Sequence, residues 1–163
     1  ASVVIRSREM SEVMHNTELA GIDEYVEIPT REPTKELLSW ADEIQKKDKP
    51  TVRDKFYAHQ AKKFEEQGVT QISLLVQVIK ISDLNIYSMP GEIFVEFAKY
   101  LKEYSPSKYT ISANLDNGCV GYVPIKELFQ PGIYEARLSR GSKLIPEGGY
   151  MMCDKLIELA NKI

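Results

Sequence analysis

Hydrophobic and polar positions alternate most regularly in the middle of the chain. From Gln71 to Val78 every even-numbered position is aliphatic, and a period of two over eight residues predicts a β-strand. Ser82-Asp83 then indicates a reversal, so Leu84 to Met89 is predicted to return as the second strand of a hairpin. The segment from Tyr109 to Leu115 predicts a further strand, followed by a turn.

Apolar residues recur at helical spacing in four other segments. The first is predicted to begin after the N-cap Thr34 and to end before Pro50, and the second to begin after Thr51 and to end at Gly68. A third amphipathic helix is expected between the Pro90-Gly91 turn and Ser105, and a fourth from about Pro146. Together, these strands and helices predict a layered α/β or α+β fold, with helices packed on a mixed or largely antiparallel sheet.

The first 32 residues have the weakest pattern. Ser2 to Ile5 is a short β-branched run, and Tyr25 to Pro29 alternates like a strand that ends at proline. We therefore treat residues 1–163 as a single domain or part of one, with residues 1–32 as a lead-in of unassigned structure. Because the chain opens on Ala1 without the features of a natural start, we expect a segment of a longer protein.

Composition excludes several classes of function. The net charge is −3 at pH 7 and no basic stripe is present, which argues against nucleic-acid binding. No apolar run approaches the ~20 residues that a transmembrane helix needs. Cys119 and Cys153 show no spacing typical of a zinc site or a disulfide framework, which favours a reducing, cytoplasmic setting by default.

Glu92 is the first candidate for chemistry. It follows Pro90-Gly91 at the expected start of a helix, where the helix dipole favours an ionised carboxylate. Such a group suits a metal ligand or a general base. The alternative is that Glu92 only caps the helix.

Tyr122 is the second candidate. It lies in a Gly121-Tyr122-Val123-Pro124 stretch, and the glycine allows a close approach to another backbone or a ligand. Its phenol could donate a hydrogen bond to an oxyanion or bind a metal as phenolate, or it could simply pack. Asn117 precedes it on the same loop. Only His15 and His59 could activate Cys119, and neither is near it in sequence, so we reject a cysteine hydrolase.

The order of these motifs resembles the neutral/alkaline non-lysosomal ceramidase family, and bacterial ceramidase-like proteins most of all. The motifs are Met89-Pro90-Gly91-Glu92, then Asn117 with Gly121 to Pro124, then Tyr134-Glu135-Ala136. The resemblance covers Glu36 to the end of the chain and is most specific from residue 89 to residue 136. It implies a zinc-dependent hydrolysis of an N-acyl amide in an α/β domain.

The resemblance also implies roles for single residues. Glu92 and Tyr122 correspond to two of the four zinc ligands, and Tyr134 to a catalytic residue at the amide. Gly91, Gly121 and Asn117 would belong to the substrate loops. In the family, the two histidine ligands lie far upstream of the glutamate, in sequence that this chain does not contain. Neither His15 nor His59 lies in the sequence context of those ligands, so we assign no ligand role to them. The threonines that follow the glutamate and the tyrosine in the family are replaced here.

We therefore expect part of a ceramidase-like amidohydrolase that is inactive alone and binds no zinc tightly by itself. Its expected partner is the missing N-terminal part of the same protein, and an uncovered face should lead to self-association. The alternative is a structural or interaction domain without a metal site.

Overall fold

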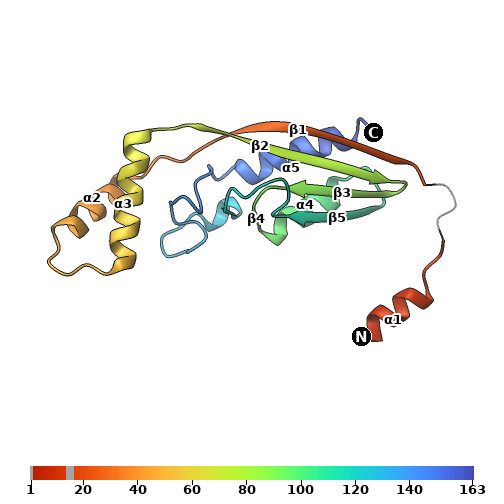
Figure 1. Ribbon diagram of the computed structural model, residues 1–163, viewed down its shortest axis with the longest axis horizontal. Coiled ribbons are helices and arrows are strands. Elements are labelled where there is room, and N and C mark those ends of the chain that lie inside the picture. Colours follow the sequence, from red (N-terminus) through yellow and green to blue (C-terminus); the bar gives the residue numbers. More distant parts are fainter. Residues whose placement is uncertain (1, 14–16) are drawn as a thin grey trace.

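A computed structural model describes residues 2–13 and 17–163 and shows an α+β fold (Figure 1). Four strands form one mixed sheet in the order β1-β2-β3-β5. The strands are β1 (Leu19–Pro29), β2 (Gln71–Ile81), β3 (Leu84–Met89) and β5 (Tyr109–Asn114). Strands β1, β2 and β3 pair antiparallel, whereas β5 runs parallel to β3. The expected fold class and the hairpin at Ser82-Asp83 are confirmed.

The helices follow from their caps and apolar stripes. Helices α2 (Lys35–Lys46) and α3 (Val52–Gln67) form a hairpin, and each begins after a threonine. The Thr34 hydroxyl accepts a hydrogen bond from the Leu37 amide at 3.2 Å, and that of Thr51 accepts one from the Asp54 amide at 3.0 Å. Both caps were predicted. The hairpin lies beyond one end of the sheet (Figure 1).

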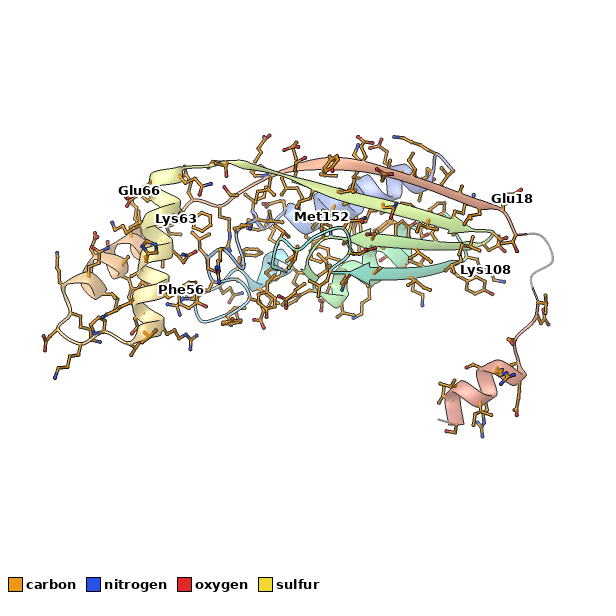
Figure 2. The ribbon with its side chains drawn as sticks, viewed as in Figure 1. Glu18, Phe56, Lys63, Glu66, Lys108 and Met152 are labelled. Atoms are coloured by element: carbon orange, nitrogen blue, oxygen red, sulfur yellow. The ribbon has the colours of Figure 1, made fainter. Side chains whose placement is uncertain are left out.

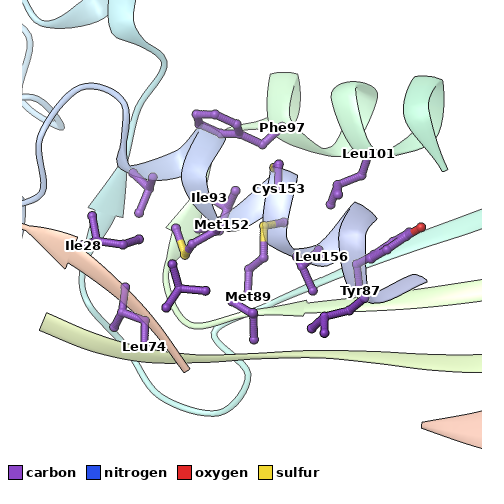
Figure 3. Packing of buried hydrophobic residues seen from close by; sticks show 14 of the residues in the cluster. Ile28, Leu74, Tyr87, Met89, Ile93, Phe97, Leu101, Met152, Cys153 and Leu156 are labelled. Carbon is purple, nitrogen blue, oxygen red and sulfur yellow. The ribbon is translucent and has the colours of Figure 1, made fainter. Parts of the chain in front are cut away.

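One face of the sheet carries the main core. Helices α4 (Val95–Tyr104) and α5 (Gly148–Ala160) both lie against this face. Figure 3 shows Tyr87 and Met89 of β3 packed with Phe97, Met152 and Leu156 from the two helices. All five are fully buried. Cys153 is buried among them, so it is a core residue, as the sequence predicted.

The lead-in contains more structure than its pattern indicated. Strand β1 begins at Leu19, well before the alternation that starts at Tyr25. The β-branched run from Ser2 to Ile5 is not extended, because it lies in helix α1 (Ser2–Glu9). No residue of α1 is buried, and the helix lies apart from the sheet (Figure 1). His15 falls outside the described residues.

Candidate functional site

Glu92 lies on a short strand rather than on a helix. Strand β3 ends at Met89, the chain turns at Pro90-Gly91, and β4 (Glu92–Ile93) follows. Helix α4 begins only at Val95, with Phe94 as its N-cap residue and no side-chain cap. The alternative that Glu92 caps this helix is therefore wrong. Its carboxylate is exposed, while Ile93 beside it joins the core.

Tyr122 lies directly beside Glu92. Strand β6 (Tyr122–Val123) pairs parallel with β4, and the register places Glu92 opposite Tyr122. The Glu92 amide donates to the Gly121 carbonyl at 2.8 Å, and the Phe94 amide donates to the Val123 carbonyl at 3.3 Å. Partners in register have side chains on the same side of their sheet. Two residues thirty positions apart thus present their oxygen atoms together.

Glycines allow this close approach of three backbone segments. A Cβ at Gly91 would come within 2.9 Å of the Gly121 carbonyl oxygen. Gly121 has φ +93°, and a Cβ there would collide with the backbone of Gly141. The Tyr122 amide donates to the Gly141 carbonyl at 2.8 Å, which explains the tight contact. Gly91 and Gly121 therefore shape the backbone around Glu92 and Tyr122.

The electrostatics of the Tyr122 phenol reflect its neighbours. A hydrogen bond with the Glu92 side chain raises the pKa of Tyr122, and the negative charge of Glu92 adds to this effect. Tyr134 and Glu135 raise the pKa further through their charges. The rings of Tyr122 and Tyr134 meet edge to face, with centroids 5.7 Å apart and an interplanar angle of 70°. The structure thus brings Glu92, Tyr122 and Tyr134 together, while their chemical roles stay predictions.

Two cations hold the loop that carries Tyr134. The Arg31 guanidinium donates to the carbonyl oxygens of Ala136 and Ser142, each at 2.7 Å. Burial lowers the pKa of Arg31 to about 10. The Arg137 guanidinium carbon lies 3.7 Å from the centroid of the Tyr57 ring on α3, and the Arg137 amide donates to the Tyr134 carbonyl at 3.1 Å.

Sequence reasoning missed both anchors. Arg31 lies in the lead-in, 105 residues before Ala136. Arg137 directly follows Tyr134-Glu135-Ala136 in the sequence, but no local pattern indicates that it stacks on a tyrosine of α3. A contact between residues this far apart in the sequence cannot be recognised from the hydrophobic periodicity, which is a local pattern.

The other loop candidates lie next to this group. The side-chain amide of Asn117 donates through Nδ2 to the hydroxyl of the buried Ser88 at 3.0 Å, so Asn117 connects its loop to β3. Cys119 is exposed and lines a cavity of about 250 Å³ together with Pro90, Asn117 and Lys143. His59 lies exposed on α3 and does not line this cavity.

The described residues do not form a complete metal centre. Across residues 2–13 and 17–163, no three or more His, Cys, Asp or Glu side chains come together in a way that could hold a metal ion. Glu92 and Tyr122 would provide two oxygen ligands, whereas zinc is almost always held by at least three protein ligands. Among the described helices, none has the length and apolar character needed to cross a membrane.

Two solved structures are similar in fold to this chain. A neutral ceramidase from Pseudomonas aeruginosa is similar over 90% of this chain, with a TM-score of 0.51 and 13% sequence identity. The fold is ceramidase-like. A second structure, described as a ceramidase complexed with C2, is similar over 54% of this chain, with a TM-score of 0.47 and 17% identity. No protein-family model and no curated protein matches the sequence.

The ceramidase-like chain spans a minor part of these neighbours. The similar regions make up 29% of the Pseudomonas aeruginosa ceramidase and 14% of the second ceramidase. Identities this low establish similarity of fold, whereas chemistry has to be argued from the residues of a site.

Proposed function

We propose that this chain is part of a ceramidase-like, zinc-dependent amidohydrolase that acts on an N-acyl amide. The observation that supports this most is the pairing of Glu92 with Tyr122 in register on parallel strands. A carboxylate and a phenol, both capable of binding a cation, lie together on a backbone that glycines hold in place. Their identity and order are those that the resemblance to ceramidases implies.

Glu92 and Tyr122 would be two of the zinc ligands. When bound, zinc would lower the pKa of a water molecule to about 7 and polarise the amide carbonyl. The chain's own contribution begins with geometry, because the strand pairing holds the backbones of Glu92 and Tyr122 side by side before any ligand arrives. Without a cation, the Glu92 carboxylate raises the pKa of the Tyr122 phenol, which keeps the phenol protonated.

Tyr134 would act on the substrate. Tyr134 is 53% exposed and its ring meets that of Tyr122 edge to face, so its hydroxyl would be able to reach a bound amide. A phenol at that place would donate a hydrogen bond to the carbonyl oxygen as negative charge develops there. Arg31 and Arg137 would hold the Tyr134 loop in place.

The remaining ligands would come from outside the described residues. Neither the exposed His59 on α3 nor any other described histidine, cysteine or carboxylate completes the set. The N-terminal part of a longer protein would supply them, and the isolated chain would be inactive. This proposal concerns the whole protein, of which the chain would form the C-terminal part.

Amide hydrolysis by the longer protein tests the proposal. We expect Glu92→Gln to reduce the rate of N-acyl amide cleavage by at least a hundredfold, while Glu96→Gln, on the exposed first turn of α4, leaves it unchanged. The alternative is a non-catalytic interaction domain. Wild-type protein that cleaves no N-acyl amide, or full activity of Glu92→Gln, would favour this alternative.

A further inference from the structure

One face of the main sheet carries apolar residues that none of the described helices covers. Residues such as Val76, Val78 and Tyr87 point to α4 and α5, so the neighbours that alternate with them point to the opposite side. In Figure 1 both helices lie behind the sheet, and the side facing the viewer is free of helices. We call this side the open face.

The open face carries two apolar rows of residues at the end of the sheet where β1 begins. In the register of the sheet, Leu19, Ile81, Leu84 and Tyr109 lie side by side on β1, β2, β3 and β5. The next row on the same side contains Ile79, Ile86 and Ile111. On an antiparallel sheet with one solvated face, these positions are normally polar. Here Tyr109 is 54% exposed, Ile111 49% and Leu19 73%.

The molecule exposes more surface than its mass predicts. Its accessible area is 10404 Å², whereas a folded monomer of this mass exposes about 8,200 Å². Part of the surplus belongs to helix α1, which is fully exposed. The α2–α3 hairpin, which lies beyond the end of the sheet, adds to the surplus as well. A standard interface buries about 800 Å² on each partner.

Charges at the two edges of the sheet suggest which partner fits. Glu18 precedes β1 at one edge, and Lys108 precedes β5 at the other edge, both at the same end of the sheet (Figure 2). Within the described residues neither side chain forms an ion pair, and the Lys108 ammonium lies 5.1 Å from the Tyr109 ring centroid. If two copies were related by a two-fold axis along the strands, Glu18 of each copy would lie opposite Lys108 of the other, which gives two pairs of opposite charge.

We propose that the open face binds a second copy of this chain. The two sheets pack face to face, with the rows of Ile79 and Ile81 interdigitating across a two-fold axis parallel to the strands. Glu18 and Lys108 flank the apolar centre and favour this orientation, because it places opposite charges together. The pairing uses neither Glu92 nor Tyr122, so it stands apart from the proposed metal chemistry.

Sedimentation of the full chain tests this pairing. We expect a dimer at micromolar concentration, and Ile111→Lys should weaken it at least tenfold, because the lysine would be buried without a partner. The matched control is Val52→Lys, which replaces an 87% exposed valine on α3 and should leave the dimer intact. Circular dichroism would confirm that both variants fold.

A charge exchange tests the orientation of the two copies. Glu18→Lys and Lys108→Glu should each weaken the dimer, and the double variant should restore it. A monomeric wild-type chain would overturn the proposal, and so would a dimer that Ile111→Lys leaves unchanged. A monomer whose open face is protected from hydrogen exchange would point to α1 or another polypeptide as the true occupant.

Discussion

Glu92 and Tyr122 stand opposite each other on two parallel two-residue strands, and the Glu92 side chain raises the pKa of the Tyr122 phenol. The pairing depends on the backbone, since the Glu92 amide also donates to the Gly121 carbonyl at 2.8 Å. A side-chain pair fixed in this way needs little reorganisation to bind a cation or a substrate. The same pair makes the site accessible to direct spectroscopic tests.

The first prediction concerns the ionisation of Tyr122. Because Glu92 raises the pKa of this phenol, Glu92→Gln should lower the pKa toward its ordinary value of about 10. Tyrosine-labelled NMR with pH titration would measure the shift, with Tyr122→Phe to assign the signal. The interaction with Glu92 stabilises the fold below pH ~10, and this contribution is lost as the pH rises through the raised pKa of Tyr122. An unchanged pKa would show that the side chains do not interact.

The second prediction concerns Gly121. Alanine at this position must adopt φ +93° and also collides with the Gly141 backbone, so we expect a loss of about 3 kcal/mol in the free energy of unfolding. Gly132→Ala is the matched control, since Gly132 has φ +95° and no atom within 4 Å of an added Cβ. It should lose only about 1 kcal/mol. Equal losses in urea unfolding would argue against the close approach.

The third prediction concerns the anchor of the Tyr134 loop. Arg31→Lys keeps the charge but loses the planar fork that binds two carbonyl oxygens, so we expect the free energy of unfolding to fall by about 2–3 kcal/mol. Hydrogen exchange should quicken in residues 134–142. Arg140→Lys, at an exposed position, should change stability by less than about 0.5 kcal/mol. Unaltered exchange in Arg31→Lys would contradict the anchoring role.

The sequence predicted the elements that have a clear period or cap. The alternation from Gln71, the hairpin at Ser82-Asp83 and the threonine caps of α2 and α3 depend on neighbouring residues alone. It also pointed to Glu92, Tyr122 and Tyr134 through short motifs in a fixed order. The structure brings these three residues together, although it does not test their chemical roles.

The rest could not be predicted for physical reasons. Strands β4 and β6 have two residues each, so they show no period. Glu92 was therefore expected on a helix and is found on a strand. The early part of β1 lacks alternation, because the charged Glu24 occupies a core-facing position between Ile22 and Val26. The contacts of Arg31 join segments more than 100 residues apart, and only the tertiary fold creates them.

Zinc content tests the central proposal most directly. Two oxygen ligands hold zinc weakly, so titration of the isolated chain should detect no tight site. The longer ceramidase-like protein should contain about one zinc ion per chain. Glu92→Ala and Tyr122→Phe should each deplete it, while Glu96→Ala, at an exposed residue of α4, should retain it. Full zinc occupancy in Glu92→Ala, measured by metal analysis of the purified protein, would contradict the assignment of Glu92 and Tyr122 as ligands.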